Sequence, residues 1–368
     1  MRICLITPPS VFLLDERFFM SLGILKVAAS LEAAGHQVEH LDLSGVANYE
    51  EVTRIHCHNT NSKMFGLTAT SPQIPAATKI TALIKQEVSD AKIIIGGPHI
   101  TLVNAASKSD KLGPSRANIE LDTLSSRYDT LVAGDGEKAI QQAVSSGYQK
   151  LIDADDPKSS YWLSSQDFTE SPWPARHLVD VDSYHYTIDG ERALSMIGML
   201  GCPFECGFCG GRQSNAFRRI RLRSIDSVIA ELEHLYLAYG VKGMMFYDDE
   251  LNVNKQCIQL MQAIKNLADK HSIEWRLRGF VKAELFNEAQ AEAMYAAGFR
   301  WLLCGFESGH PKILKNINKK ATLEDNSLML RIAHKYGLKV KALMSIGHPG
   351  ESKETVLATK DWLLEEKP

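Results

Sequence analysis

Three cysteines stand close together in the stretch "GCPFECGFCGG" at residues 201–211. Cys202, Cys206 and Cys209 follow the spacing C-x-x-x-C-x-x-C, and thiolates are soft ligands that suit zinc, copper(I) or iron–sulfur clusters. The chain has 368 residues and seven cysteines, and an odd number in a chain of this size argues against a disulfide framework. The spacing therefore predicts a metal site with three local thiolates.

The number of local ligands discriminates between metals. A structural zinc ion takes four closed ligands, so zinc would need a distant partner such as His185 or Asp248. An iron–sulfur cubane also usually takes four cysteines, and a cubane held by three leaves one iron open to a substrate or cofactor. Gly207 and Gly210 permit close approach of the backbone, and Phe208 can shield one face. These features favour an iron–sulfur cluster over zinc.

Strand and helix patterns alternate five times after residue 192, which is typical of a parallel (β/α) barrel or part of one. We expect the strands at "ALSMIGML", "VKGMMFYDD", "IEWRLRGF", "RWLLCGFES" and "KVKALMSIGHPGE". Their carboxyl ends carry the cysteine loop, "YDDE", "FESG" and "IGHPGE", and this end of a barrel is where functional residues lie.

The first 150 residues predict a different α/β fold, a doubly wound, flavodoxin-like parallel sheet. We expect buried strands at "RICLITP", "HQVEHLDLSG", "MFGLTATS", "AKIIIGGPH" and "DTLVAGDGE". Ligands of such sheets bind beyond the carboxyl ends of the strands, and these ends are rich in glycine and small hydroxyl residues. The fingerprint G-x-G-x-x-G is absent after the first strand, which disfavours a standard dinucleotide site.

The expected organisation is a first domain at residues 1–150, a linker rich in proline and polar residues at 151–192, and a partial barrel at 193–368. The barrel shows five strands, so either the chain is a fragment lacking the last strand or the barrel is open. A net charge of −3 argues against nucleic-acid binding. No apolar run approaches the roughly 18 residues of a membrane span, and no signal-peptide cleavage site follows the first strand, so we expect a cytoplasmic protein.

The cysteine loop resembles the C-x-x-x-C-x-aromatic-C loop of the radical S-adenosylmethionine (SAM) superfamily. "FYDDELNVNK", "LLCGFESGHPKILKNINKK" and "MSIGHPGESKET" are similar to that family's second, fourth and fifth strand motifs, in the same order. The first half, with "SLGILKVAASLEAAGHQVEHLDLSG", "IIIGGPH" and "TLVAGDGE", is similar to the cobalamin-binding domain that precedes the barrel in one large subgroup.

The resemblance implies that Cys202, Cys206 and Cys209 hold a [4Fe–4S] cluster whose open iron is chelated by SAM. Reduction by an external donor of the flavodoxin or ferredoxin type then yields a 5′-deoxyadenosyl radical, which takes a hydrogen atom from the substrate. The further SAM contacts that it implies are Phe208 and Gly210 in the loop, Asp248, Asp249 and Glu250 near the methionyl amine and ribose, Glu307 and Ser308 at the ribose or methionyl group, and Ile346 and Gly347 at the adenine.

The chain departs from the family pattern before the cysteine loop, where Leu200 replaces a frequent arginine, and after the third strand, where Lys282 and Glu284 replace Arg-x-Asp. A lysine cannot offer the planar fork of arginine, so a bidentate contact there is in doubt.

Cobalamin contacts are assigned by loop position alone, and the candidates are Thr70, Ser71, Gly96, Gly97, Gly134 and Gly136. His99 either touches the nucleotide tail or caps a turn. The loop D-x-H-x-x-G is absent, so we expect base-off cobalamin with no protein histidine on the cobalt.

The leading functional hypothesis is methylation of an unactivated carbon in a small-molecule or natural-product substrate, with methylcobalamin as the methyl donor. A radical rearrangement or ring-forming reaction, with cobalamin as redox partner, is the first alternative. A radical enzyme whose first domain is only a scaffold is the second, and a zinc-stabilised binding protein without catalysis is the third.

Two further motifs are expected to be structural. "RRIRLR" (Arg218–Arg223) could grip a phosphate, but a solvated rim is the favoured interpretation. "HCH" (His56–His58) could bind a metal, but it lacks partners at ligand spacing and is predicted as a surface loop.

Overall fold

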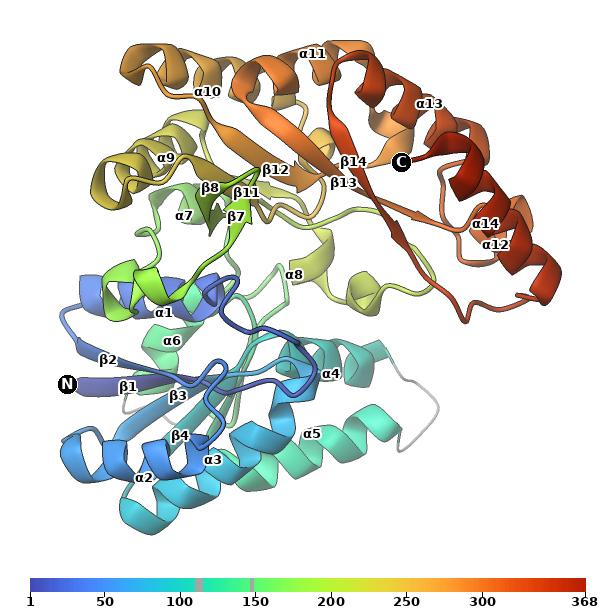
Figure 1. The fold of residues 1–368 in the computed structure, drawn as a ribbon. Helices are drawn as coiled ribbons and strands as arrows, with labels where there is room; N and C mark the ends of the chain where they lie inside the picture. Colours follow the sequence, from blue (N-terminus) through green and yellow to red (C-terminus); the bar gives the residue numbers. More distant parts are fainter. Residues whose placement is uncertain (110–114, 146–148) are drawn as a thin grey trace. The chain divides into compact units, whose positions relative to one another are not determined.

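The computed structural model describes residues 1–109, 115–145 and 149–368. These residues form two compact units, one of Met1–His185 with Gln213–Ala216 and one of Tyr186–Arg212 with Phe217–Pro368. Each unit has its own α/β architecture around a largely parallel sheet (Figure 1). In the part of the chain that is described, no helix is long and apolar enough to span a bilayer.

The first unit contains a six-stranded parallel sheet in the order β2-β1-β3-β4-β5-β6, the doubly wound topology that the sequence predicts. Its elements are β1 (Arg2–Thr7), α1 (Leu22–Ala33), β2 (Gln37–Asp42), α2 (Tyr49–Asn59), β3 (Met64–Thr68), η1 (Ser71–Gln73), α3 (Ile74–Glu87), β4 (Lys92–Gly96), α4 (Pro98–Ser109), α5 (Arg116–Arg127), β5 (Thr130–Gly134), α6 (Gly136–Val144), β6 (Leu151–Ala154), α7 (Ser165–Glu170), η2 (Arg176–Leu178) and η3 (Val181–Ser183). The strand order reverses between β1 and β3, and this switch point is where such sheets bind ligands.

The first strand shows how the sequence specifies this sheet. Residues Ile3–Thr7 are all buried, because helices cover both faces. Cys4 and Ile6 point to one face and join a core with residues of α2, α3 and α5, whereas α1 and α6 pack together over the opposite face (Figure 1). A strand buried on both sides reads as a continuous apolar run, and for this reason the sequence located it.

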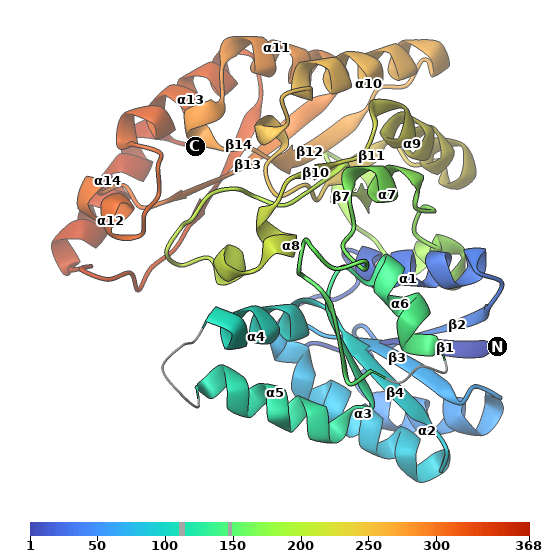
Figure 2. The same ribbon diagram turned by 180° about the vertical axis from the view of Figure 1, so that it is seen from behind.

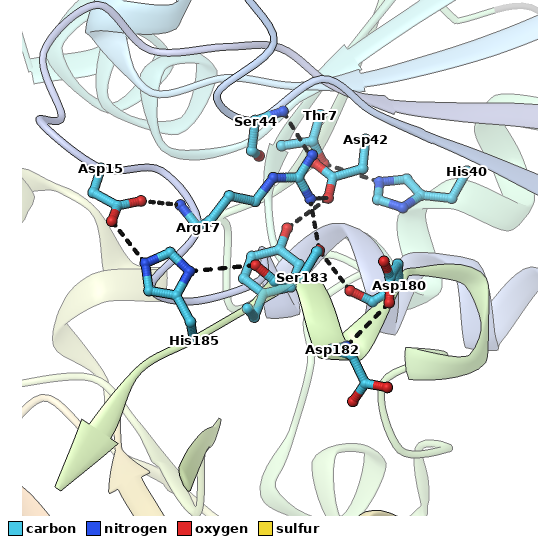
Figure 3. A network of polar contacts seen from close by, with 11 residues as sticks. Thr7, Asp15, Arg17, His40, Asp42, Ser44, Asp180, Asp182, Ser183 and His185 are labelled. Carbon is cyan, nitrogen blue, oxygen red and sulfur yellow. Dashed lines mark hydrogen bonds and ion pairs between the residues drawn. The ribbon is translucent and has the colours of Figure 1, made fainter. Parts of the chain in front are cut away.

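The segment predicted as a linker is largely part of the first unit. Leu151–Ala154 form β6, which pairs with β5 and buries Ile152 and Ala154. The following segment is fastened to the ends of β1 and β2 by the polar network of Figure 3, in which Tyr184 and Arg17 both donate to Asp42 Oδ2, at 2.6 and 2.7 Å. The first unit therefore extends to His185 rather than ending at residue 150.

The prediction of a surface loop at residues 56–58 is wrong, because these residues belong to α2. Thr53 and Cys57 lie four residues apart on the buried face of this helix, so a helical period is present, but it is short of strongly apolar residues.

The second unit contains a six-stranded sheet in the order β14-β13-β12-β11-β8-β7, in which β7 is antiparallel to β8 and the other pairings are parallel. Its elements are β7 (Thr187–Ile188), β8 (Glu191–Met196), β9 (Met199–Leu200), η4 (Gly210–Gln213), α8 (Asn215–Arg218), β10 (Arg221–Leu222), α9 (Ile225–Tyr239), β11 (Gly243–Phe246), η5 (Leu251–Val253), α10 (Cys257–His271), β12 (Arg276–Phe280), η6 (Ala283–Leu285), α11 (Glu288–Ala297), β13 (Phe299–Glu307), α12 (Pro311–Asn316), α13 (Leu323–Lys335), β14 (Lys339–Met344) and α14 (Lys353–Glu366).

The five predicted strands of the partial (β/α) barrel are therefore confirmed as β8, β11, β12, β13 and β14. Figure 2 shows α9, α10, α11 and α13 along one face of this curved sheet. α9 is capped at its start by Ser224, whose hydroxyl accepts the Ser227 N–H, and at its end by Gly240 in the left-handed conformation.

Candidate functional site

The cysteine loop lies between β9 and η4 and is braced by backbone contacts on both sides. The Cys202 N–H donates to the Phe217 carbonyl at 2.9 Å. Arg218 Nη2 donates to the Pro203 carbonyl at 2.7 Å, and its Nη1 lies 3.0 Å from the Glu205 carboxylate. Arg218 thus holds the loop that carries the thiolates. The prediction of a solvated rim for "RRIRLR" is also wrong at Arg221, which is buried.

A second brace comes from the segment Ile317–Lys319, which follows α12. The Gly207 N–H donates to the Ile317 carbonyl at 2.6 Å, and Asn318 Nδ2 donates to the Glu205 carbonyl at 2.8 Å. Sequence reasoning included this segment in a family motif but assigned it no role. Its two hydrogen bonds fix the middle of the cysteine loop, between Cys202 and Cys209.

The three thiols are not placed as the ligands of one zinc ion would be. Thiolates around one tetrahedral zinc would lie about 3.8 Å apart, because each Zn–S bond is about 2.3 Å. Among the described residues, the group of three or more potential ligands that converges within 4.8 Å is elsewhere in the chain, and Cys202, Cys206 and Cys209 do not form such a group. Of the distant zinc ligands considered, His185 belongs to the first unit and pairs with Asp15 at 2.9 Å (Figure 3).

Burial raises the pKa of the Cys202 thiol to about 11 and also raises the pKa of Cys206. The ammonium groups of Lys319 and Lys282 oppose this effect at Cys206. Without a metal both thiols therefore favour the protonated form, and a bound metal must displace their protons to obtain thiolate ligands.

The three acidic residues that follow β11 have different environments. Asp248 is buried and its Oδ2 accepts the Gly198 N–H at 3.0 Å, and burial raises the pKa of this carboxyl to about 7. Asp249 Oδ2 accepts the Gly201 N–H at 2.8 Å, directly before Cys202. These two carboxylates hold the chain that leads into the cysteine loop.

Glu250 is the acidic residue of this set that is suited to a cationic ligand. Its Oε2 is buried and has no hydrogen-bond partner among the described residues. Burial raises the pKa of Glu250 to about 7, against the opposing charges of Lys319 and Lys282. A buried carboxylate oxygen without a donor is unfavourable, so a bound ammonium would satisfy it. The residue thus fits the predicted contact with the methionyl amine.

Glu307, at the end of β13, is held in a strained conformation. Its φ is +65°, in the left-handed region, and the register of β13 with β14 shifts between Gly305 and Glu307. Glu307 Oε2 accepts the Ser345 hydroxyl at 2.7 Å, and Oε1 lies 3.5 Å from Lys319 Nζ. The two groups lie over Gly305, where an added Cβ would press on the Glu307 carboxylate and displace it.

Lys319 is the functional residue that the sequence analysis missed. Burial works to lower the pKa of Lys319, but the charges of Glu307, Cys206 and Glu250 outweigh it and leave the pKa above its usual value. The side chain is thus a buried cation that faces both the cysteine loop and the acidic rim. Lys282, the departure noted in the sequence, is also buried, pairs with Glu284 at 2.7 Å and lies 4.1 Å from the Phe204 ring.

The remaining predicted SAM contacts differ in availability. Ile346 is 79% exposed, and an added Cβ at Gly347 would meet nothing within 4 Å, so both remain open to a ligand. Phe208 is half exposed, with its ring 5.5 Å from that of His348. The Ser308 hydroxyl is buried and lies 3.2 Å from the Thr359 hydroxyl of α14, so its side chain points into the protein. Gly210 begins the turn η4.

In the first unit, four of the predicted cobalamin contacts meet at the carboxyl ends of β3 and β4. The Ser71 hydroxyl lies 2.9 Å from His99 Nδ1, and the His99 N–H donates to the Ala69 carbonyl at 3.0 Å. Thr70 lies beside them, and an added Cβ at Gly97 would come within 2.7 Å of the Thr68 hydroxyl. His99 Nε2 lies 3.4 Å from Glu120. Both ring nitrogens of His99 thus have partners, and the absence of a histidine on cobalt stays a prediction.

At three of the predicted glycines, atoms of the protein lie close to the place that a side chain would occupy. An added Cβ at Gly134 would lie 2.4 Å from the Ala154 carbonyl carbon, and one at Gly136 would lie 2.6 Å from Val27. At Gly96 an added Cβ would approach the Val132 carbonyl to 3.4 Å. Packing requires Gly134 and Gly136, so their contact with cobalamin stays a prediction.

The loop after β1 adds an apolar surface at the switch point of this sheet. Val11–Leu14 are four consecutive exposed apolar residues. The loop is held on both sides, since Ser10 N–H donates to Glu16 at 2.6 Å and Asp15 Oδ1 accepts the Arg17 N–H at 2.8 Å (Figure 3). Exposed apolar side chains after β1, together with the hydroxyls of Thr70 and Ser71 after the neighbouring strand β3, suit a large ligand with an apolar face and polar edges, such as a corrin.

Comparison with known proteins agrees with both units. Residues 196–363 match the model of the radical SAM superfamily, and residues 17–112 match that of the B12 binding domain. An uncharacterized methyltransferase of Pyrococcus horikoshii is 28% identical over 375 positions, which cover 98% of this chain and 77% of the relative. The anaerobic magnesium-protoporphyrin IX monomethyl ester cyclase of Cereibacter sphaeroides is 25% identical, over 79% of this chain and 47% of its own length.

Among solved structures, the radical SAM methyltransferase TsrM of Kitasatospora setae matches with a TM-score of 0.76 and 19% identity, over 100% of this chain and 71% of that one. This similarity supports the same fold for both units. The two family matches show the predicted architecture, a radical SAM unit preceded by a B12-binding domain.

Proposed function

We propose that this protein is a cobalamin-dependent radical SAM enzyme that transfers a methyl group to an unactivated carbon of a small molecule. The observation that carries the proposal is the presence, in one chain, of a B12-binding domain and of a barrel unit whose cysteine loop is accompanied by the buried, unpartnered carboxylate oxygen of Glu250. The Pyrococcus methyltransferase, which aligns over nearly the whole chain, supports methyl transfer as the outcome.

When bound, the cluster and SAM would supply a 5′-deoxyadenosyl radical, and cobalamin would supply the transferable methyl group. Cys202, Cys206 and Cys209 would hold the cluster, with the loop fixed by Arg218 and the segment Ile317–Lys319. The absence of a fourth cysteine from the loop leaves one iron open for SAM.

Other side chains orient SAM and exclude water. Glu250 would accept from the methionyl ammonium, and Ile346 and Gly347 would offer an apolar wall and an open backbone edge to the adenine. Lys319 and Ser345 keep the Glu307 carboxylate directed along the rim, where it can accept from ribose hydroxyls. In the first unit, Thr70, Ser71 and the loop Val11–Leu14 would contact base-off cobalamin.

Ring formation is a second candidate, and one comparison favours it. The cyclase of Cereibacter sphaeroides aligns with 79% of this chain, so the shared part of the two proteins includes most of both units. An oxidative cyclisation removes hydrogen atoms from the substrate and adds no methyl group, and the mass of the product therefore separates the two reactions.

The test uses anaerobically purified, cluster-loaded protein supplied with SAM that carries a deuterated methyl group, a reductant and cobalamin. We expect formation of 5′-deoxyadenosine, retention of the corrinoid on a desalting column, and products heavier by one labelled methyl group in a small-molecule extract. The variant Cys206→Ala should form no 5′-deoxyadenosine, whereas Cys257→Ala, which alters a buried cysteine of α10, should behave as the wild type. Colourless, iron-free protein after loading would overturn the proposal.

We also propose that an external donor of the flavodoxin or ferredoxin type supplies the electron, that the substrate is of the natural-product type, and that the protein is cytoplasmic.

A further inference from the structure

A second group of metal-ligand side chains lies in the first unit, away from the rim of Thr70 and Ser71. Cys4 of β1, Glu39 of β2 and His56 of α2 place one thiol sulfur, one carboxylate oxygen and one ring nitrogen within 4.8 Å of one another. Cys4 and Glu39 are direct neighbours in the register of the sheet, and His56 comes from the helix that covers this face. The tight contacts are Cys4 Sγ to His56 Nε2, 3.2 Å, and Glu39 Oε2 to His56 Nε2, 3.5 Å.

The hydrogen bonds of this group are weak at the sulfur. The Cys4 thiol lies 3.8 Å from the Leu5 carbonyl, to which it can donate. A proton on His56 Nε2 can face both Glu39 Oε2 and Cys4 Sγ, and sulfur is a weak acceptor. The feature that indicates a metal is therefore the closeness of three ligand atoms that come from three different elements.

The arrangement also differs from that of a catalytic triad. In a Cys-His-carboxylate triad the thiol and the carboxylate contact opposite nitrogens of the ring, so that one orients the imidazole and the other exchanges a proton with it. Here both contact Nε2. The shared nitrogen brings the three potential ligand atoms close to one another, as they would lie around a single metal ion.

The distances between these atoms are close to those between the ligands of a tetrahedral zinc ion. Bond lengths of about 2.3 Å to sulfur and about 2.0–2.1 Å to nitrogen or oxygen give edges of roughly 3.6 Å between sulfur and nitrogen and roughly 3.3 Å between nitrogen and oxygen. The observed distances of 3.2 and 3.5 Å therefore need only small adjustments.

The carboxylate is also oriented as a metal ligand would be. The Thr60 hydroxyl donates to Glu39 Oε2 at 2.7 Å, and Arg2 Nε lies 3.3 Å from Glu39 Oε1. Ligating carboxylates commonly receive such outer hydrogen bonds, which fix their direction. The side chains of Glu39 and His56 are 28% and 23% exposed, so water can reach the remaining corner of the tetrahedron.

We propose that Cys4, Glu39 and His56 form a zinc site with an open fourth position, where α2 meets strands β1 and β2. Zinc accepts a soft thiolate together with nitrogen and oxygen ligands, and its binding displaces the thiol proton to solvent. α2 buries only Thr53 and Cys57 among its described residues, so a bound metal would add to the few contacts that hold this helix on the sheet. The proposal does not depend on the proposed function of the chain.

The test uses the full chain with Cys202→Ala, Cys206→Ala and Cys209→Ala, so that the cysteine loop cannot bind metal. The metal-free protein is titrated with Co²⁺, which reports a thiolate ligand by a charge-transfer band in the near ultraviolet and tetrahedral geometry by strong visible bands. We expect one equivalent to produce both signals, and His56→Gln to abolish or greatly weaken them. His58→Gln is the matched control, because His58 lies on the same helix, is 68% exposed and faces Glu87.

A melting experiment on the same protein gives a second readout. A hundredfold excess of Zn²⁺ over its dissociation constant should raise the melting temperature of the first unit by roughly 5–10 °C. The increase should disappear in His56→Gln and persist in His58→Gln. Absence of the cobalt bands, bands of equal strength in His56→Gln, or a melting temperature that does not respond to zinc would each overturn the proposal.

Discussion

Replacing Lys319 by methionine tests whether one buried ammonium group holds the acidic rim of the barrel together. Lys319 Nζ lies 3.5 Å from Glu307 Oε1, and the side chains are only 7% and 12% exposed. Removing one partner of a buried ion pair costs about 3–5 kcal/mol, because the other charge is left uncompensated. Glu307 retains the Ser345 hydroxyl at 2.7 Å, so we expect a loss of about 3 kcal/mol, at the lower end of that range.

The loss should depend on pH in a defined direction. The pKa of Glu250 is about 7 because of burial, and Lys319 works to lower it. Without Lys319 the folded-state pKa rises further, so above pH 7 the folded variant binds more protons than the folded wild type. The stability difference between the two proteins then grows with pH, by up to about 1.4 kcal/mol per pH unit, until the pH reaches the raised pKa of the variant. Below about pH 7 both folded proteins hold this proton, so the contribution vanishes.

The assay is hydrogen exchange of the β13 and β14 amides in the metal-free protein, at about pH 6 and about pH 8, because it reports the opening of the second unit alone. Lys320→Met is the matched control, since Lys320 is the exposed neighbour in sequence and its replacement should change stability by less than about 0.5 kcal/mol. Equal protection in the two variants, or a deficit that shrinks as the pH rises, would refute the account of Lys319 as a buried counter-ion.

Three further predictions address single residues. Asp155 Oδ1 accepts both the Ser214 hydroxyl at 2.6 Å and the Ala216 N–H at 2.7 Å. Asp155→Ala should therefore lower the free energy of unfolding, measured in urea, by about 2–4 kcal/mol and expose the Ala216 amide to exchange. Asp155→Asn keeps this acceptor and should lower it by less than about 1 kcal/mol. Gly134→Ala should lower the stability of the first unit by at least about 2 kcal/mol, because φ is +91° and the new Cβ would lie 2.4 Å from a backbone carbon of β6; thermal unfolding measures this. Stability of the second unit should fall as pH rises from the ordinary carboxyl range through about 7, where folded Glu250 ionises, and Glu250→Gln should flatten that part of the pH profile in exchange measurements.

The sequence predicted those elements whose signal is local. The five strands expected in each half are present, because parallel strands covered on both faces appear as short apolar runs between turn residues. β6 was missed because four residues, Leu151–Ala154, carry too weak a pattern, and its pairing with β5 is a long-range contact. The segment around Tyr184 was also misassigned, because its polar composition indicates a linker. In the structure the Tyr184 hydroxyl donates to Asp42, which is a long-range contact and holds the segment on the first unit.

The candidate site was predicted in its residue types and only partly in their roles. The motif after β11 does not distinguish the roles of its three acidic residues. In the structure the carboxylates of Asp248 and Asp249 accept from backbone N–H groups, whereas Glu250 Oε2 has no donor among the described residues. Lys319 stands in a run of polar residues that indicates exposure. Its burial results from the approach of β13 and the cysteine loop, which no local pattern encodes.

The charges of the barrel rim together favour a cationic ligand. Glu250 and Glu307 share the ammonium group of Lys319, and Lys282 also acts on Glu250, but burial still holds the pKa of Glu250 near 7. A cluster ligated by Cys202, Cys206 and Cys209 would add further negative charge, which would make ionised Glu250 still less favourable. A ligand that carries an ammonium and a sulfonium group supplies the missing positive charge, so its affinity should rise as Glu250 ionises. Because linkage is reciprocal, binding of such a ligand near neutral pH should release protons from the rim.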